Sequence, residues 1–227
     1  MNYFVAGTDT GVGKTLISCA LLHGFAARGQ RAVGMKPVAA GCDAGGHNED
    51  ALKLQAAGNV ALGYGQINPY CFVPAIAPHL AAQRAGVIVQ FSRIAASYKE
   101  LAAQSDVVIV EGAGGLLVPL NDEQDSADLV KELGLPIILV AGMRLGCLNH
   151  ALLTVEVIAS RGLVLAGWAA NIVDADMASI EENVAALQQR IAAPLLGIVP
   201  RLPHPDARAA AGHLDLDRLY NTGESPD

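Results

Sequence analysis

Short apolar segments alternate along this chain with longer segments whose apolar residues recur at helical spacing. The short segments are apolar on both faces, which is typical of parallel strands buried between two layers of helices. The pattern predicts strands at residues 3–6, 31–36, 107–110, 136–141, 163–170 and 195–199, and helices at 14–27, 91–104, 125–133, 148–161 and 177–191. This alternation indicates a three-layer α/β fold, with a mostly parallel β-sheet and helices on both faces. Ligands of such sheets bind beyond the carboxyl ends of the strands.

The composition favours one folded domain over residues 1–220, followed by a frayed tail at 221–227. Of the 227 residues, 52% are apolar and 16% charged, which excludes disorder for most of the chain. The net charge of −7 disfavours non-specific binding to nucleic acid or to an anionic membrane. The longest apolar runs fall far short of the roughly 20 residues that span a bilayer. The N-terminus resembles no signal peptide, so we expect a cytoplasmic protein.

The cysteines and histidines give no sign of a metal centre. The four cysteines are far apart in the sequence, at Cys19, Cys42, Cys71 and Cys147. In a chain without a leader this spacing favours reduced thiols over disulfides or zinc. The six histidines form no recognisable metal-binding motif, so a histidine-bound metal is not expected.

The most informative motif lies between the first predicted strand and the first predicted helix, at residues 7–15. Its glycines let the backbone fold around phosphates, and the helix N-terminus presents free N–H groups to an anion. Lys14 can then reach the terminal phosphates, and Thr15 can place its hydroxyl on Mg²⁺. Five residues separate Gly7 from Gly13, one more than the usual pattern has. The motif predicts a variant phosphate-binding loop; a glycine-rich turn with an incidental lysine is the alternative.

Two acidic residues and a second lysine are candidates for the same site. Glu111 follows the predicted strand 107–110, where phosphate-loop enzymes hold Mg²⁺, although a carboxylate can also simply cap a turn there. Asp50 begins the segment 51–57, and by spacing alone a helix N-cap is its favoured role. Lys36 ends a predicted strand and could stabilise charge on a transferring phosphoryl group. An exposed, solvated lysine fits its position equally well.

Two further positions follow predicted strands. Asn171 comes after the strand 163–170, and its carboxamide can pair with the amino group and a ring nitrogen of adenine. An asparagine there can equally be a turn residue. Residues 145–150 precede a predicted helix and offer a second N-terminal anion site. The alternative is an ordinary loop in which Asn149 is the N-cap.

Five segments in this order resemble the dethiobiotin synthase family, the ATP-dependent ligases of biotin biosynthesis. They are residues 7–15, 36–39, 110–115, 145–150 and 166–168, and the resemblance runs from residue 3 to about residue 206. It implies a P-loop nucleoside triphosphate hydrolase-like fold and a cyclo-ligase that acts on 7,8-diaminononanoate, CO₂ and ATP. One amine would take up CO₂ as a carbamate, whose oxygen attacks the γ-phosphate. The second amine would then close the cyclic urea, giving dethiobiotin, ADP and phosphate.

The resemblance also implies roles for individual residues. Thr15, Asp50 and Glu111 match Mg²⁺ ligands, while Lys36 and Lys14 match catalytic lysines. The implied ATP-binding positions are Gly11, Val12, Gly13, Lys14, Thr15, Leu16, Asp50, Glu111, Gly112, Ala113, Gly114, Asn171, Pro200, Arg201, Leu202 and Asp206. The implied substrate-binding positions are Lys36, Ala40, Gly146, Cys147, Leu148 and Asn149. The last four would serve the neighbouring subunit, so the resemblance implies a homodimer.

Three positions depart from the family pattern. Ala40 stands where many relatives carry a serine that contacts substrate. Gly11 stands where a larger residue, often glutamate, is found, so its ATP contact would come from the backbone alone. Asp206 is shorter than the usual glutamate.

Two other ATP-using classes compete with this interpretation. Partitioning ATPases act as nucleotide switches and carry a second, earlier lysine in their loop, whereas residues 8–10 contain none. Such switches often need a basic or amphipathic surface, and this acidic chain shows none. The synthetase half of a cobyrinate-type amidotransferase would need a glutaminase, for which 227 residues leave no room. A pure binding module is disfavoured because an acid and two lysines would surround one phosphate site.

Overall fold

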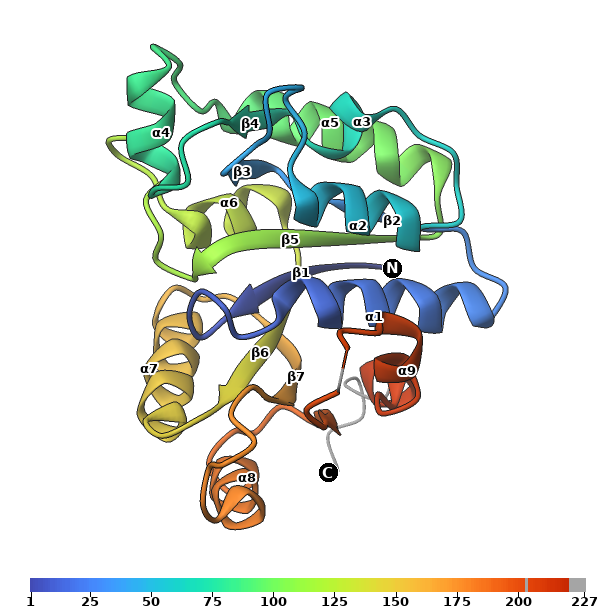
Figure 1. The fold of residues 1–227 in the computed structure, drawn as a ribbon, viewed down its shortest axis with the longest axis vertical. Helices are drawn as coiled ribbons and strands as arrows, with labels where there is room; N and C mark the ends of the chain where they lie inside the picture. Colours follow the sequence, from blue (N-terminus) through green and yellow to red (C-terminus); the bar gives the residue numbers. More distant parts are fainter. Residues whose placement is uncertain (203, 221–227) are drawn as a thin grey trace.

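The centre of the molecule is a parallel sheet of six strands in the order β2-β5-β1-β6-β7-β8 (Figure 1). The computed structural model describes residues 1–202 and 204–220, so the expected tail at 221–227 lies outside the described residues. The strands of the main sheet are β1 (Asn2–Gly7), β2 (Ala32–Met35), β5 (Val107–Gly115), β6 (Ile137–Met143), β7 (Leu165–Ile172) and β8 (Leu195–Val199). Two short strands, β3 (Val38–Ala40) and β4 (Tyr70–Phe72), form a separate parallel pair.

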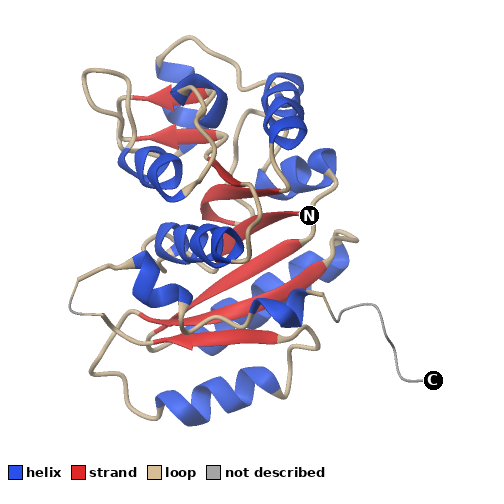
Figure 2. Cartoon of the chain, turned by 90° about the vertical axis from the view of Figure 1, so that its right-hand side faces the viewer, coloured by secondary structure: helices blue, strands red, loops and turns tan. Residues whose placement is uncertain are grey.

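Helices cover both faces of the main sheet (Figure 2). They are α1 (Lys14–Ala27), α2 (Glu49–Ala57), α3 (Tyr64–Ile67), α4 (Pro78–Arg84), α5 (Phe91–Gln104), α6 (Ser126–Leu133), α7 (Cys147–Ser160), α8 (Ile180–Gln188), α9 (Ala207–Ala211) and the 3₁₀ helix η1 (Leu216–Leu219). Within the described part of the chain, no helix is both long enough and apolar enough to cross a membrane.

The central strands β1 and β6 are buried on both faces, and their successive side chains point to opposite sides of the sheet. In β1, Val5 packs with the apolar residues of α1, α2 and α9. Its neighbours Phe4 and Ala6 pack instead with those of α5, α6, α7 and α8. The two cores on either side of the sheet confirm the predicted three-layer α/β fold with a parallel sheet.

The carboxyl ends of the central strands meet at one edge, where the arrowheads of β1, β5 and β6 point in Figure 1. β1 pairs in parallel with β5 on one side and with β6 on the other. The loop from β1 to α1 therefore lies between the ends of two neighbouring strands, where open α/β sheets bind ligands.

Several element boundaries differ from those predicted. β5 continues to Gly115 and β7 to Ile172, so Glu111 and Asn171 lie within strands rather than after them. The short elements β3, β4, α3, α4 and α9 were not predicted, because three to seven residues are too few to show a clear period.

The prediction that all cysteines are reduced was wrong for one pair. Cys42 and Cys71 form a disulfide, with their Cα atoms 6.1 Å apart. The pairing of β3 with β4 causes this proximity, since Ala39 lies opposite Cys71 and Cys42 follows shortly after. The two cysteines are 29 residues apart in sequence, so their spacing gave no sign of the bridge. Cys19 and Cys147 are free and buried.

Candidate active site

The loop between β1 and α1 has the backbone of a phosphate cradle. Gly11 and Gly13 have positive φ angles of 73° and 90°, a conformation that favours glycine. A Cβ at Gly13 would lie 2.1 Å from the side-chain nitrogen of Asn171, so no larger residue fits. α1 begins without a side-chain cap and without an acidic residue in its first turn. Its first N–H groups are therefore available to an anion.

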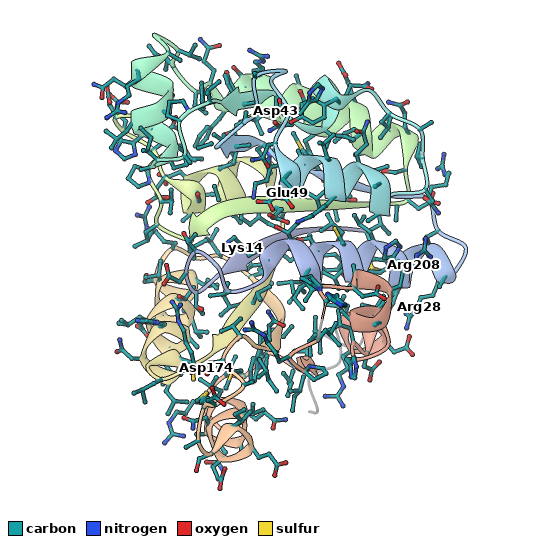
Figure 3. All side chains as sticks on the ribbon, in the orientation of Figure 1. Lys14, Arg28, Asp43, Glu49, Asp174 and Arg208 are labelled. Carbon is teal, nitrogen blue, oxygen red and sulfur yellow. A yellow bond between two sulfur atoms is a disulfide. The ribbon has the colours of Figure 1, made fainter. Side chains whose placement is uncertain are left out.

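Lys14 lies at the start of α1, beside this loop (Figure 3). Its Nζ donates to the backbone oxygen of Asp9 at 2.9 Å. The side chain is largely buried, since Lys14 is only 7% exposed. Burial, and then the charge of Lys36, lower the pKa of Lys14 to about 8. A bound phosphate would offset both effects by supplying an opposite charge.

Lys36 follows β2 directly, and its ammonium group lies in a buried cluster of acceptors. Nζ donates to Glu111 Oε1 at 2.6 Å and to the backbone oxygen of Gly112 at 3.1 Å. Asp50 Oδ2 is 3.4 Å away. Burial disfavours the ammonium form, but the charges and hydrogen bonds of Glu111 and Asp50 outweigh it and raise the pKa of Lys36. The side chain is 5% exposed, so the interpretation of Lys36 as a solvated surface lysine is wrong.

Thr15 and Glu111 meet at the floor of the site. Thr15 Oγ1 donates to Glu111 Oε1 at 2.9 Å. The other carboxylate oxygen of Glu111, Oε2, is buried and has no hydrogen-bond partner among the residues that the structure describes. A buried acceptor of this kind can take a cation or a hydrogen-bond donor. This oxygen argues against Glu111 as a simple turn cap.

The donors at this position suit Mg²⁺. They comprise two carboxylates, of Asp50 and Glu111, and the hydroxyl of Thr15. Among residues 1–202 and 204–220, no three His, Cys, Asp or Glu side chains gather as a metal-binding group. Mg²⁺ needs no such cage, because it keeps several waters and binds through one or two carboxylates plus phosphate oxygens. The residues present therefore fit the ion.

Asp50 is not the N-cap of its helix. That role belongs to Asn48, whose side-chain oxygen accepts from the backbone N–H groups of Asp50 and Ala51 at 3.0 and 3.3 Å. The carboxylate of Asp50 is thus free to face Lys36. Burial raises the pKa of Asp50, but Lys36 and the hydroxyl of Thr15 outweigh this effect and lower it. An asparagine before an acidic first turn is a sequence signal for a cap, and that signal was missed.

A cavity of about 730 Å³ opens over these groups. Ten of the implied site residues line it: Gly11, Gly13, Lys14, Thr15, Lys36, Ala40, Asp50, Glu111, Ala113 and Gly114. The cavity thus brings together the phosphate loop, both lysines and the acidic pair from segments far apart in the sequence. Val12, Leu16 and Gly112 do not line it; Val12 is buried, and Gly112 packs against the ring of Phe4.

The residues expected on the adenine side do not line this cavity. Asn171 is 5% exposed and donates from its side chain to the backbone oxygen of Val12 at 2.8 Å, so it braces the phosphate loop. Arg201 donates to the backbone oxygen of Val173. Asp206 is the N-cap of α9 and accepts from two backbone N–H groups. Contacts of these residues, and of Pro200 and Leu202, with ATP stay predictions.

The loop before α7 also lies outside the cavity. Gly146, with a φ of 93°, is the N-cap of α7, so the interpretation of Asn149 as the cap is wrong. Cys147 is buried, Leu148 is half-buried, and Gly146 and Asn149 are exposed. α7 has neither a side-chain cap nor an acidic residue in its first turn. Arg144 forms an ion pair with Asp9 of the phosphate loop, a link that sequence reasoning missed.

A parallel sheet with such a phosphate loop at the carboxyl ends of its strands defines the P-loop nucleoside triphosphatase class. The chain is similar to the MinC:MinD cell division complex of Aquifex aeolicus, with a TM-score of 0.56 and 13% identity over 100% of this chain and 97% of that chain. It also resembles the septum site-determining protein MinD of Pyrococcus horikoshii OT3, complexed with Mg-ADP, with a TM-score of 0.53 and 15% identity over 98% of this chain and 90% of that one. At these identities the likeness shows the fold alone.

Sequence comparisons define the family within this class. A family model described as an AAA domain matches residues 1–209. The chain is 55% identical to the ATP-dependent dethiobiotin synthetase of Nitrosospira multiformis over 218 residues, 96% of each chain. It is 53% identical to that of Ralstonia nicotianae, over 95% of this chain and 96% of the relative. The chain therefore belongs to the ATP-dependent dethiobiotin synthetase family, a family of C–N-bond-forming ligases in biotin biosynthesis, which confirms the resemblance noted in the sequence.

Proposed function

We propose that this protein, as one ATP-binding unit over residues 1–220, makes dethiobiotin from 7,8-diaminononanoate, CO₂ and ATP, releasing ADP and phosphate. The observation that carries the proposal is the buried ammonium of Lys36, held 2.6 Å from Glu111 and facing the cavity beside the phosphate loop. Membership of the dethiobiotin synthetase family supplies the reaction class.

Lys14 and the phosphate loop hold the triphosphate in this proposal. The N–H groups at the start of α1 and the ammonium of Lys14 bind its terminal phosphates. Lys36 stabilises the negative charge that develops as the carbamate oxygen attacks the γ-phosphate. The second amine then displaces phosphate and closes the ring. Phosphoryl transfer needs mainly positioning and charge stabilisation, both of which these two lysines supply.

Mg²⁺ is the cofactor in this proposal. Thr15, Asp50 and Glu111 would hold it, and the unpartnered Oε2 of Glu111 is the supporting observation. When bound, the ion neutralises charge on the phosphate oxygens. The ammonium of Lys36 would then share Glu111 with the metal, since it already bonds Oε1. Asn171, residues 200–202 and Asp206 would contact the adenine side of ATP.

A homodimer would complete each substrate site. In one subunit, the loop of Gly146, Cys147, Leu148 and Asn149 would bind the carboxylate of the substrate in the neighbouring subunit's cavity. Lys36 and Ala40 of that neighbouring subunit would lie near the substrate's amines. Two observations support this: the loop does not line the cavity of its own chain, and the uncapped start of α7 can accept an anion. The need for ATP favours the cytoplasm as the place of action.

The test is incubation with ATP, Mg²⁺, bicarbonate and 7,8-diaminononanoate, with product mass and ADP both measured. We expect the cyclic urea and ADP in equal amounts, with Lys36→Met as the matched inactive control. ADP without the cyclic urea would favour a nucleotide switch over a ligase. Absence of both products from folded protein would overturn the proposal.

A further inference from the structure

The backbone of Lys36 is held on both sides by the end of α3. Its N–H donates to the backbone oxygen of Ile67 at 2.8 Å. Its own backbone oxygen accepts from the side-chain nitrogen of Asn68 at 2.6 Å, and the same nitrogen donates to the backbone oxygen of Tyr70 at 3.0 Å. Asn68 is 4% exposed. Buried hydrogen bonds of this kind fix the starting point from which the side chain of Lys36 reaches into the cavity.

Tyr64 connects Asn68 to the helix that carries Asp50. Its hydroxyl donates to Asn68 Oδ1 at 2.9 Å and accepts from the backbone N–H of Asn48 at 2.7 Å. Asn48, in turn, caps α2 by accepting from the backbone N–H of Asp50. A continuous chain of hydrogen bonds thus runs from the backbone of Lys36 through Asn68, Tyr64 and Asn48 to Asp50.

We propose that Asn68, Tyr64 and Asn48 form a positioning chain, centred on the Tyr64 hydroxyl, that sets the placement of Lys36 relative to Asp50. The inference rests on the proposed function, because it concerns the same site. Lys36 Nζ and Asp50 Oδ2 are 3.4 Å apart, longer than the usual charge-assisted hydrogen bond. A small shift of α2 would therefore break their contact or close it.

Tyr64 suits this role because its ring is stiff and its hydroxyl uses both its donor and its acceptor capacity. Tyr64 is not one of the described residues that line the cavity. Its hydroxyl therefore acts through its neighbours and not directly on a ligand. Outer hydrogen-bond partners of metal ligands typically change metal affinity by about ten- to a hundredfold when they are removed.

The main test is Tyr64→Phe, which removes the hydroxyl and keeps the ring. We expect Mg²⁺ to strengthen ADP binding about tenfold less than in the wild type, measured by calorimetry. Binding of metal-free ADP should be unchanged, because the phosphate loop is untouched. In steady-state assays with Mg²⁺, kcat should fall and KM for ATP should rise, because the metal-bound nucleotide binds more weakly. The matched control is Tyr98→Phe, which also loses a hydrogen-bonded hydroxyl, the partner of the Asn2 side chain, at a site away from the cavity.

A double-mutant cycle separates positioning from loss of stability. In an Asp50→Asn background, Tyr64→Phe should cause no further loss of the Mg²⁺ effect on ADP binding, because the residue it positions has already lost its charge. Equal losses in both backgrounds would show that Tyr64 does not act through Asp50 and would overturn the inference.

A second pair of variants covers the case in which Tyr64→Phe does not fold. Asn48→Ala removes the cap of α2, whereas Asn48→Ser retains a capping acceptor and adds no charge to the cavity, which Asn48 also lines. We expect the alanine variant to lose the Mg²⁺ effect and the serine variant to retain it; wild-type behaviour of both variants would overturn the inference. A wild type that makes no cyclic urea would refute the proposed function, while the ADP measurements would still decide on the positioning chain. An active wild type whose Tyr64→Phe variant matches Tyr98→Phe would refute the positioning chain alone.

Discussion

The replacement Lys14→Met tests whether the buried ammonium of Lys14 destabilises the folded protein as long as no phosphate is bound beside it. Methionine keeps a similar length and removes the charge. Because Lys14 is 7% exposed and its pKa is lowered, its ammonium destabilises the nucleotide-free fold. The variant should therefore be more stable than the wild type and at the same time unable to bind ATP normally.

The size of the effect follows from the pKa. The value falls from 10.5 to about 8, and each pKa unit corresponds to about 1.4 kcal/mol. The charged side chain thus costs the fold about 3 kcal/mol at pH 7. Methionine also loses the hydrogen bond to the backbone oxygen of Asp9, worth about 1 kcal/mol. We expect Lys14→Met to raise the free energy of unfolding by about 2 kcal/mol at pH 7.

The sign of the pH dependence gives a second check. The folded protein releases the proton of Lys14 at lower pH than the unfolded chain does, so the wild type gains stability from about pH 8 to 10.5. The advantage of the variant should therefore shrink over this interval. Urea unfolding of both proteins at pH 7 and pH 10 measures the difference in stability, from which the titration of groups remote from Lys14 cancels.

A variant that is less stable at pH 7, or a difference that does not change with pH, would refute the argument from burial. Calorimetry with ATP and the dethiobiotin assay complete the test. Near-normal binding and turnover in Lys14→Met would refute the assignment of the phosphate loop itself.

Three further predictions concern other parts of the site. Glu111→Gln should raise the Mg²⁺ concentration needed for half-maximal activity, because a carboxylate is lost from the proposed site. It should also lower the free energy of unfolding by about 3 kcal/mol, because Lys36 loses its nearest buried counter-charge. Unchanged values in both assays would make Glu111 a structural residue only. Cys42→Ser should have a free energy of unfolding about 3–4 kcal/mol lower than that of the oxidised wild type, because the bridge to Cys71 closes a loop across 29 residues. Equal urea midpoints for the variant and the oxidised wild type would contradict this prediction. If the proposed homodimer shares its sites, an inactive Lys36→Ala protein mixed with an inactive Asn149→Ala protein should regain activity after subunit exchange, since one site of each mixed dimer would have both parts intact; verified exchange without recovery would exclude the shared site.

The local features of this protein could be read from the sequence. The strand, loop and helix around residues 7–15 were predicted, and α1, α5 and β8 begin and end where the pattern placed them. These features depend on residues within a few positions of one another, such as the glycines of the phosphate loop and the apolar period of each element. The parallel sheet followed from the same alternation, because strands that are apolar on both faces need helices on both sides.

The tertiary structure alone decided what the charged residues do. Lys36 and Glu111 are 75 residues apart in sequence, and only the pairing of β2 with β5 brings them together. Whether Lys36 is solvated or buried, and whether the carboxylate of Asp50 meets a lysine, depends on which segments pack around each residue; only the helix cap at Asn48 could have been read from neighbouring residues. The Cys42–Cys71 disulfide likewise required the pairing of β3 with β4. Burial and charge pairing are properties of segments that meet in space, and a sequence pattern records only those that are adjacent along the chain.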